Sequence, residues 1–269
     1  MPVKRLLIFG LGYTARAFVR RLGMEWEVVA TTRGTNGPVL PDGGFDGVTH
    51  ILGSIPPDET GDPVLARYGS EITALNSLQW LGYLSTTGVY GTRDGGWVDE
   101  TSDLRPTGAR GERRVAAERG WLALGAHVFR LAGIYGPGRS AFDALRAGTA
   151  KRIDVGGQVF SRIHVDDIAG VLLASIAKPR PRAIYPAVYN VCDDEPAAQE
   201  AVLAHAAQLL GIEPPPLIPL ADAELSPMAR SFYADNKRVS NALIKTELGV
   251  TLAYPSYREG LAAVLAAGG

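Results

Sequence analysis

The chain begins with an apolar run that ends abruptly in closely spaced glycines. The run extends from Val3 to Phe9, and the sequence Gly10-Leu11-Gly12-Tyr13-Thr14-Ala15 follows it. An almost unbroken apolar run is typical of a parallel strand that is buried on both faces, and helical spacing of apolar residues resumes between residues 17 and 22. A strand that turns into a helix over such glycines directs backbone N–H groups at one point, which suits a pyrophosphate. We therefore expect a dinucleotide to bind at this turn, which contains Gly10, Gly12, Tyr13, Thr14 and Ala15.

The end of the second predicted strand indicates which dinucleotide binds. This strand covers Val28 to Ala30 and is followed by Thr31-Thr32-Arg33. In folds of this kind an acidic residue here commonly holds the ribose 2′-hydroxyl of NAD. Thr32 and Arg33 occupy the position instead, and a guanidinium can pair with a 2′-phosphate through charge-assisted hydrogen bonds. The sequence therefore favours NADP over NAD.

Composition limits the partners of the chain. Its 269 residues, 46% hydrophobic and 20% charged, are enough to bury a substantial core. A net charge of −1 gives no general attraction to nucleic acid or to an anionic membrane, and no apolar run approaches the roughly 18 residues that span a bilayer. Cys192 is the only cysteine, which excludes an intrachain disulfide and a cysteine-rich zinc site. We expect a cytoplasmic monomer or homodimer that binds a small molecule and no metal.

Strand and helix patterns alternate over residues 1–195, which predicts a doubly wound, parallel, Rossmann-like α/β sheet. The Gly- and Pro-rich stretch 34–47 predicts an irregular crossover rather than a full helix. Residues 196–269 read as helices separated by prolines, and we expect them to form a smaller substrate-binding lobe packed on the core. Residues 137–157 could belong to either part. Loops at the carboxyl ends of such strands bind ligands, which adds three residues to the expected cofactor site: Ser54, Ile55 and Pro56.

Several segments match the motifs of one family in order and spacing. They are the glycine turn, the hydroxyl-rich loop 85–91, Glu100, and residues 106–118, 130–138, 162–169 and 189–195. Together they resemble the extended branch of the short-chain dehydrogenase/reductase superfamily, the NAD-dependent epimerase/dehydratase type. The resemblance covers nearly the whole chain. It implies a nicotinamide cofactor in the crevice of the sheet.

The resemblance also implies catalytic residues, and here the chain departs from the family pattern. A catalytic hydroxyl falls on Thr86, and a Tyr-x-x-x-Lys pair is expected on the following helix, where the lysine lowers the pKa of the tyrosine. In this sequence Arg110 stands at the tyrosine position and Arg114 at the lysine position. Arginine stays protonated, so Arg110 cannot exchange a proton near neutral pH, whereas Arg114 can still hold a ribose hydroxyl. An enzyme of this sequence needs another proton donor, and the candidates are Tyr90, Tyr135 and His164.

Other residues enter the expected site by the same resemblance. Those near the cofactor are Ser85, Arg114, Leu131 and Gly133. Those near the substrate are Tyr135, Arg139, Arg162, His164 and Arg230. Several arginines at one pocket favour an anionic substrate such as a phosphate, a nucleotide or a carboxylate. Asp166 and Asp167 are expected to cap the helix that starts there rather than to bind a metal.

Three functions stay open at this point. The first is an NADP-dependent oxidoreductase or epimerase/dehydratase-like enzyme that acts on a small, anionic substrate by hydride transfer. The second is a non-catalytic NADP(H)-binding sensor, which the missing tyrosine favours because a sensor needs no proton transfer. The third is a lyase or isomerase that keeps its cofactor bound through transient oxidation, and the sequence does not separate it from the first.

Overall fold

The structure, a computed structural model, describes residues 4–35, 37–178, 187–225, 233 and 235–268. Its centre is a six-stranded sheet in which all neighbouring strands are parallel. The strands across the sheet are, in order, β12 (Val188–Val191), β8 (His127–Leu131), β6 (Trp80–Thr86), β5 (His50–Gly53), β1 (Lys4–Phe9) and β2 (Trp26–Ala30). The predicted α/β fold with a doubly wound parallel sheet is confirmed.

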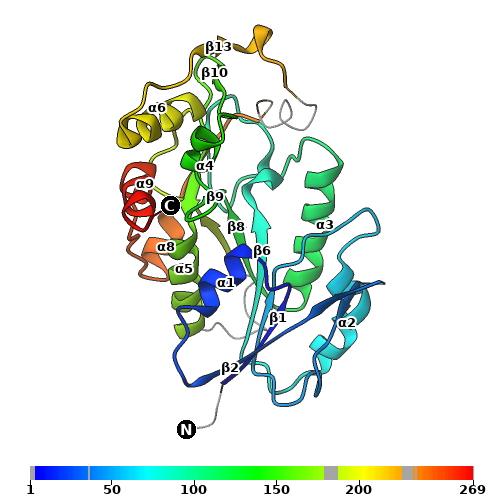
Figure 1. The fold of residues 1–269 in the computed structure, drawn as a ribbon. Coiled ribbons are helices and arrows are strands. Elements are labelled where there is room, and N and C mark those ends of the chain that lie inside the picture. Colours follow the sequence, from blue (N-terminus) through cyan, green and yellow to red (C-terminus); the bar gives the residue numbers. More distant parts are fainter. Residues whose placement is uncertain (1–3, 36, 179–186, 226–232, 234, 269) are drawn as a thin grey trace.

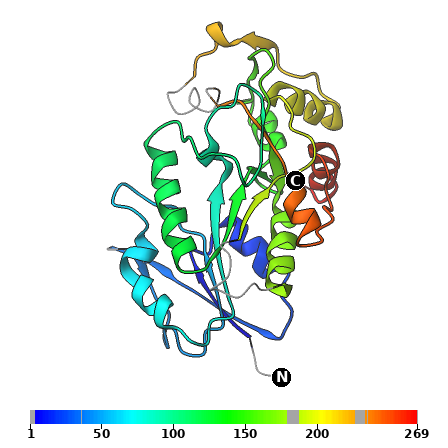
Figure 2. The ribbon, with the colours of Figure 1, turned by 180° about the vertical axis from the view of Figure 1, so that it is seen from behind.

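Helices cover both faces of this sheet (Figures 1 and 2). One face carries α1 (Tyr13–Val19) and α5 (Val165–Ala177), and the other carries α2 (Pro63–Ala74) and α3 (Ala109–Ala123). Alternation along β1 explains why its last four residues, Leu6 to Phe9, are all apolar. Leu6 and Ile8 pack in the cluster that includes α1 and α5, whereas Leu7 and Phe9 pack with α2 and α3.

The stretch 34–47 is more regular than the sequence predicts. β3 (Thr32–Gly34) and β4 (Gly37–Val39) form an antiparallel hairpin there. The hydroxyl of Tyr68 on α2 donates a hydrogen bond of 3.0 Å to the carbonyl of Pro38, which holds the hairpin against the helix. The chain then returns to the opposite side of β1, so the strand order reverses between β1 and β5. Such a reversal leaves a crevice at the carboxyl ends of the two strands.

A smaller lobe lies beyond the carboxyl ends of the strands (Figure 1). It contains two short parallel pairs, β9 (Gly133–Tyr135) with β11 (Arg162–His164), and β10 (Arg152–Asp154) with β13 (Leu217–Pro219). Its helices are α4 (Ala141–Arg146), α6 (Gln199–Leu210) and α9 (Tyr257–Ala266), and a short 3-10 helix, η2 (Leu220–Asp222), follows β13. The three α-helices share an apolar cluster with Tyr135 that is separate from the two clusters of the sheet. Segments from both sides of residue 195 therefore build this lobe.

Part of the chain after residue 196 lies against the central sheet rather than in the lobe. The helix α8 (Ala242–Thr246) packs on the central sheet, where Ile244 joins the main apolar cluster. Just before it, β14 (Arg238–Val239) pairs with β7 (Trp97–Val98) beside the core. No helix within the described ranges is long and apolar enough to cross a membrane.

Candidate functional site

The glycine turn after β1 is tightly packed at Gly10 and open at Gly12. Gly10 has a φ of +90°, and a Cβ there would lie 2.7 Å from Cγ1 of Ile55, so only glycine fits. At Gly12, by contrast, no atom of the described residues lies within 4 Å of the position that a Cβ would occupy. Thr14 and Ala15 are buried behind this open side at the start of α1. A phosphate group can therefore approach the backbone of Gly12.

Two further expected cofactor segments lie beside the turn. Ile55, which contacts Gly10, belongs to the loop Ser54-Ile55-Pro56 at the end of β5. Thr32 and Arg33 are exposed on β3, at the end of the second strand of the sheet. An open hollow of about 610 Å³ adjoins the hairpin, and it is lined by Thr35, Gly37, Asp58, Thr60, Pro63, Ala66 and Arg67. The structure thus brings the expected dinucleotide residues to one edge of the sheet.

A buried polar network lies beneath the hydroxyl-rich loop. Glu118 of α3 and Arg130 of β8 form an ion pair of 2.8 Å, with side chains only 1% and 5% exposed. Ser85 donates its hydroxyl to Glu118 at 2.5 Å, and the same guanidinium donates to the hydroxyl oxygen of Tyr90 at 2.8 Å. Tyr90 in turn donates to Oδ1 of Asn190 at 2.8 Å. The network ties α3 to three strands of the sheet.

This network engages two residues that the sequence placed at the site, Tyr90 and Ser85. Tyr90, in the short 3-10 helix η1 (Thr87–Tyr90), is fully buried, and burial raises the pKa of its phenol to about 12. Its hydroxyl already donates to Asn190 and accepts from Arg130, so it is not a proton donor for a substrate. The hydroxyl of Ser85 is likewise engaged, because it donates to Glu118. Both residues support the site from below.

Thr86 and the two arginines of α3 lie around the end of β6. Oγ1 of Thr86 accepts the N–H of Gly88 at 3.1 Å, which leaves its own proton available for donation. Arg114 donates from Nη1 to the carbonyl of Leu84 and to the hydroxyl oxygen of Tyr83, both at 3.0 Å. Arg110 is exposed one turn earlier on the helix, and residues four apart share a helix face. The Arg114 guanidinium is therefore placed beside the carboxyl end of β6, and Arg110 lies one turn earlier on the same helix.

The helix α3 begins at Ala109, so Arg110 lies in its first turn. This turn packs tightly on the preceding segment, because a Cβ at Gly111 would lie 2.6 Å from Cβ of Pro106.

His164 and its neighbours lie at the start of α5, where their side chains bind backbone groups. His164 is 2% exposed, and its Nδ1 accepts the backbone N–H of Asp166 at 3.2 Å, so the histidine caps the helix. Asp167 does not cap it, because its carboxylate accepts the N–H groups of Ala253 and Tyr254. Burial lowers the pKa of His164, which disfavours a charged imidazole that could donate a proton. The histidine is a structural residue.

Two other expected substrate residues have structural roles. The guanidinium of Arg162 is buried and donates to the carbonyls of Phe160 and Ala197 at 2.8 and 2.7 Å. Tyr135 is 8% exposed, and its hydroxyl donates to the carbonyl of Ser256 at 3.3 Å while burial raises its pKa. Neither side chain is free to bind a substrate. Leu131 and Gly133 lie near them, at the end of β8 and the start of β9.

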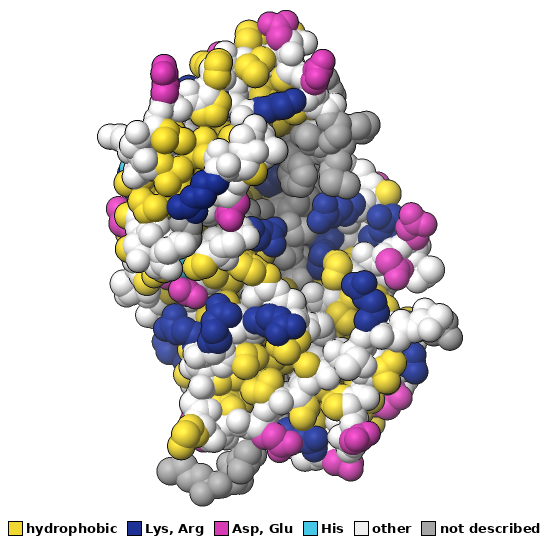
Figure 3. Space-filling model, in the orientation of Figure 1, with side chains coloured by type: hydrophobic (Ala, Val, Ile, Leu, Met, Phe, Trp, Pro, Cys, Tyr) yellow, Lys and Arg dark blue, Asp and Glu magenta, His cyan; other side chains and the backbone are white. Residues whose placement is uncertain are grey.

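Arg139 and Arg230 are the last two residues that the sequence places near the substrate. Arg139 is exposed, with its guanidinium carbon 5.8 Å from the centre of the Tyr13 ring. Arg230 lies outside the described residues. On the face shown in Figure 3, Lys and Arg side chains gather around a hollow between the lobe and the sheet.

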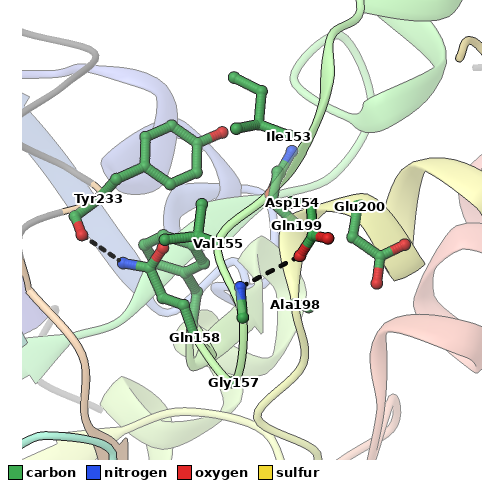
Figure 4. A pocket seen from close by; sticks show the side chains of 11 residues that line it. Ile153, Asp154, Val155, Gly157, Gln158, Ala198, Gln199, Glu200 and Tyr233 are labelled. Atoms are coloured by element: carbon green, nitrogen blue, oxygen red, sulfur yellow. Dashed lines mark hydrogen bonds between the residues drawn. The ribbon is translucent and has the colours of Figure 1, made fainter. Parts of the chain in front are cut away.

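The lobe contains a cavity that the sequence analysis missed (Figure 4). Its volume is about 60 Å³, and its lining includes Asp154, Gln158, Glu200 and Tyr233. Gln158 is 6% exposed and donates from Nε2 to the carbonyls of Tyr233 and Asp235, whereas its Oε1 has no partner among the residues that the structure describes. The cavity therefore offers hydrogen-bond acceptors rather than cations. The described part of the chain contains no group of His, Cys, Asp or Glu residues that could hold a metal ion.

Asp193, at the end of β12, is a buried acid that the sequence analysis also missed. It is 1% exposed, and its carboxylate makes no hydrogen bond of good geometry, although the N–H of Glu195 is close. Burial raises its pKa to about 8, and the neighbouring Arg162 guanidinium only partly opposes this shift. The folded protein therefore keeps a proton on Asp193 that the unfolded chain releases near pH 4.

Substituting Asp193 by Asn is expected to change how stability depends on pH. For the native chain the free energy of unfolding should fall as pH rises from about 4 to about 8, by at most about 1.4 kcal/mol per pH unit for this group, and then level. The amide of D193N has no proton to lose, so its curve should be flatter in this range. Urea unfolding at several pH values measures the difference. The exposed Asp103→Asn serves as the control, and parallel curves for D193N and the native chain would contradict the assignment.

The chain is similar in sequence to proteins from two bacteria. No family model matches the chain. It is 29% identical over 178 residues to the protein YeeZ of Escherichia coli strain K12, a match that covers 64% of this chain and only 58% of YeeZ. It is 52% identical to a conserved protein of unknown function from Silicibacter pomeroyi, whose structure superposes with a TM-score of 0.90 and coverage of 98% and 99% of the two chains.

Two further solved structures resemble this chain and have names that indicate a protein family. A putative NAD-dependent epimerase/dehydratase from Methylobacillus flagellatus is 26% identical, with a TM-score of 0.65 over 100% of this chain and 99% of that one. The chain has the extended short-chain dehydrogenase/reductase fold. A more distant example of this fold, the human epimerase family protein SDR39U1 solved with NADPH, is 17% identical, with a TM-score of 0.70 over 97% and 98% of the two chains.

Proposed function

We propose that the chain is an NADP-dependent oxidoreductase or epimerase/dehydratase-like enzyme that acts on a small, anionic substrate. One observation carries the proposal: the glycine turn is open at Gly12, while an exposed guanidinium, Arg33, follows the neighbouring strand β2. An open backbone suits the pyrophosphate and a cation suits a 2′-phosphate. The NADPH in the human structure of the same fold supports the choice of NADP, whereas NAD is the less favoured cofactor.

The residues around the end of β6 would act on the nicotinamide side. Bound NADP(H) supplies hydride transfer. Arg114, already fixed by Leu84 and Tyr83, would hold a hydroxyl of the nicotinamide ribose. Thr86 would donate its free proton in a hydrogen bond to a substrate carbonyl, which polarises that group. Arg110, exposed on the same helix, would bind an anionic group of the substrate.

A second candidate function is a non-catalytic NADP(H) sensor. A specific observation favours it: Tyr90 and His164 are occupied by structural hydrogen bonds, and so is Tyr135. None of these three proton-donor candidates can serve a substrate, and arginine does not exchange its proton near neutral pH. A sensor requires different affinities for the oxidised and reduced cofactors, because a ligand shifts a conformation only through differential binding.

One experiment separates the two functions. NADP⁺ and NADPH are titrated into the protein by calorimetry, and nicotinamide absorbance is followed with a panel of carbonyl compounds and sugar nucleotides. Binding with turnover of a panel member supports the enzyme. Binding without turnover and with unequal affinities supports the sensor. Failure to bind either cofactor at millimolar concentration overturns both.

Substituting Arg33 by Ala tests the cofactor preference. Because hydrogen bonds to charged groups contribute about 1.5–3 kcal/mol, we expect the Kd for NADPH to rise about 10- to 150-fold. The Kd for NADH should stay within about threefold, since NADH has no 2′-phosphate. Arg105→Ala, which removes an exposed arginine paired with Asp103, is the control and should change neither value. An equal loss for NADPH and NADH would contradict a role for Arg33 at the 2′-phosphate.

A further inference from the structure

A tight turn follows β9 on the lobe side of the crevice. It consists of Gly136, Pro137, Gly138 and Arg139, and its ends exchange two backbone hydrogen bonds of 3.1 and 3.0 Å. Gly138 has a φ of +70°, and Gly136 has one of +155°. Both are conformations that residues with a side chain rarely adopt. The turn is thus a fixed backbone unit rather than an open loop.

This turn is attached to the glycine turn of β1. The hydroxyl of Tyr13 donates a hydrogen bond of 3.1 Å to the carbonyl of Pro137, which is 124 residues away in the chain. A Cβ on Gly136 would lie 2.6 Å from the same hydroxyl, so the glycine is what lets the two segments approach. Because Tyr13 directly follows Gly12, this hydrogen bond joins the turn 136–139 to the residue after the glycine turn.

Arg139 places a cation at this junction. Its guanidinium lies over the ring of Tyr13 with 5.8 Å between the guanidinium carbon and the ring centre, and the residue is exposed. Within the described ranges it pairs with no carboxylate, and nearby Asp143 is already engaged by the N–H and hydroxyl of Ser140 at 2.6 and 2.9 Å. A planar guanidinium held against an aromatic ring is restricted in orientation before it meets an anion.

We propose that Arg139 binds the pyrophosphate of the cofactor, and that the Tyr13–Pro137 hydrogen bond holds the turn 136–139 across the dinucleotide as a clamp. The proposal rests on the proposed function and sharpens it. It also moves Arg139 from the expected substrate pocket to the cofactor. An anion bound at the backbone of Gly12 would meet backbone N–H groups on one side and the Arg139 guanidinium on the other, and such charge-assisted pairing is the stronger kind of hydrogen bond.

The experiment compares two probes that share the adenosine 2′-phosphate. NADPH contains a pyrophosphate, whereas adenosine 2′-monophosphate contains no phosphate at its 5′ position. For Arg139→Ala we expect the Kd for NADPH to rise about tenfold or more, with the Kd for adenosine 2′-monophosphate unchanged. Arg33→Ala should weaken both probes. Tyr13→Phe, which keeps the ring but loses the bond to Pro137, should weaken NADPH alone, by a smaller factor.

Arg146→Ala is the matched control. Arg146 is exposed on α4 and lies 5.6 Å from the ring of Phe142, so it has the same type of contact away from the glycine turn. It should bind both probes as the native protein does. An NADPH Kd for Arg139→Ala within twofold of the native value would overturn the clamp while leaving the proposed function intact. A native protein that binds neither probe would overturn both.

Discussion

The Arg130→Met variant is expected to lose about 3–5 kcal/mol of its free energy of unfolding, because Glu118 would keep its charge in a buried site without a partner. The two side chains are 5% and 1% exposed, and water cannot replace the lost ion pair. The guanidinium also donates to Tyr90, whose hydroxyl oxygen would lose this donor. Urea unfolding at pH 7, followed by circular dichroism, measures the loss.

Two comparisons show whether burial is the cause. The exposed pair Asp103–Arg105, with side chains 73% and 67% exposed, should lose no more than about 0.5 kcal/mol when Arg105 is replaced by Met. The double variant Glu118→Leu/Arg130→Met should recover much of the single variant's loss, because no unpaired charge is left in the interior. A loss below about 1 kcal/mol for Arg130→Met alone would show that the ion pair is not important for stability.

The Gly12→Asp variant is expected to bind NADPH about 100- to 1000-fold more weakly while folding normally. Two like charges about 4 Å apart interact by about 4 kcal/mol at an effective dielectric constant of 20, and the pyrophosphate would meet the new carboxylate at about this distance. The backbone accepts the change, because Gly12 has a φ of −85° and no atom lies within 4 Å of a Cβ. Calorimetric titration and thermal unfolding measure the two effects separately.

Gly12→Asn is the matched control for this variant. Asparagine has nearly the size of aspartate and no charge, and both residues are favoured at the position before a helix. We expect the Asn variant to lose about tenfold in affinity at most. If the Asp and Asn variants bind NADPH equally well, charge at Gly12 does not matter, and the phosphates do not lie there.

The sequence predicted the sheet and the strand-turn-helix unit at its start because both depend on local patterns. The apolar run before Gly10 and the spacing of the glycines are confined to fifteen residues, and the structure confirms the strand, the turn and the helix there. The short crossover between β2 and β5 was also visible as a lack of helical pattern. Its hairpin was missed, because the Tyr68–Pro38 hydrogen bond joins residues 30 positions apart.

The proton-donor candidates could not be judged from the sequence, because their partners are far away in the chain. Tyr90 is bonded to a residue 100 positions later, and Tyr135 to one 121 positions later. A motif places such a residue near a site but does not show whether its hydroxyl is free. Arg130 was the one available signal of the network, since a charged residue inside a strand buried on both faces requires a partner.

Two separate parts of the chain build the lobe, and this determines which segments could be exchanged with another protein of the same fold. The apolar cluster of the lobe joins Tyr135 and Phe142 from the middle of the chain to α6 and α9 from its last third. A chimaera that exchanges only the C-terminal part would cut this cluster in two and leave mismatched apolar surfaces on both sides. Transferring the substrate specificity of another protein therefore requires three segments to be exchanged together: residues 133–164, 196–241 and 247–266. The helix α8 between the last two segments is kept, because it packs on the sheet of the recipient protein.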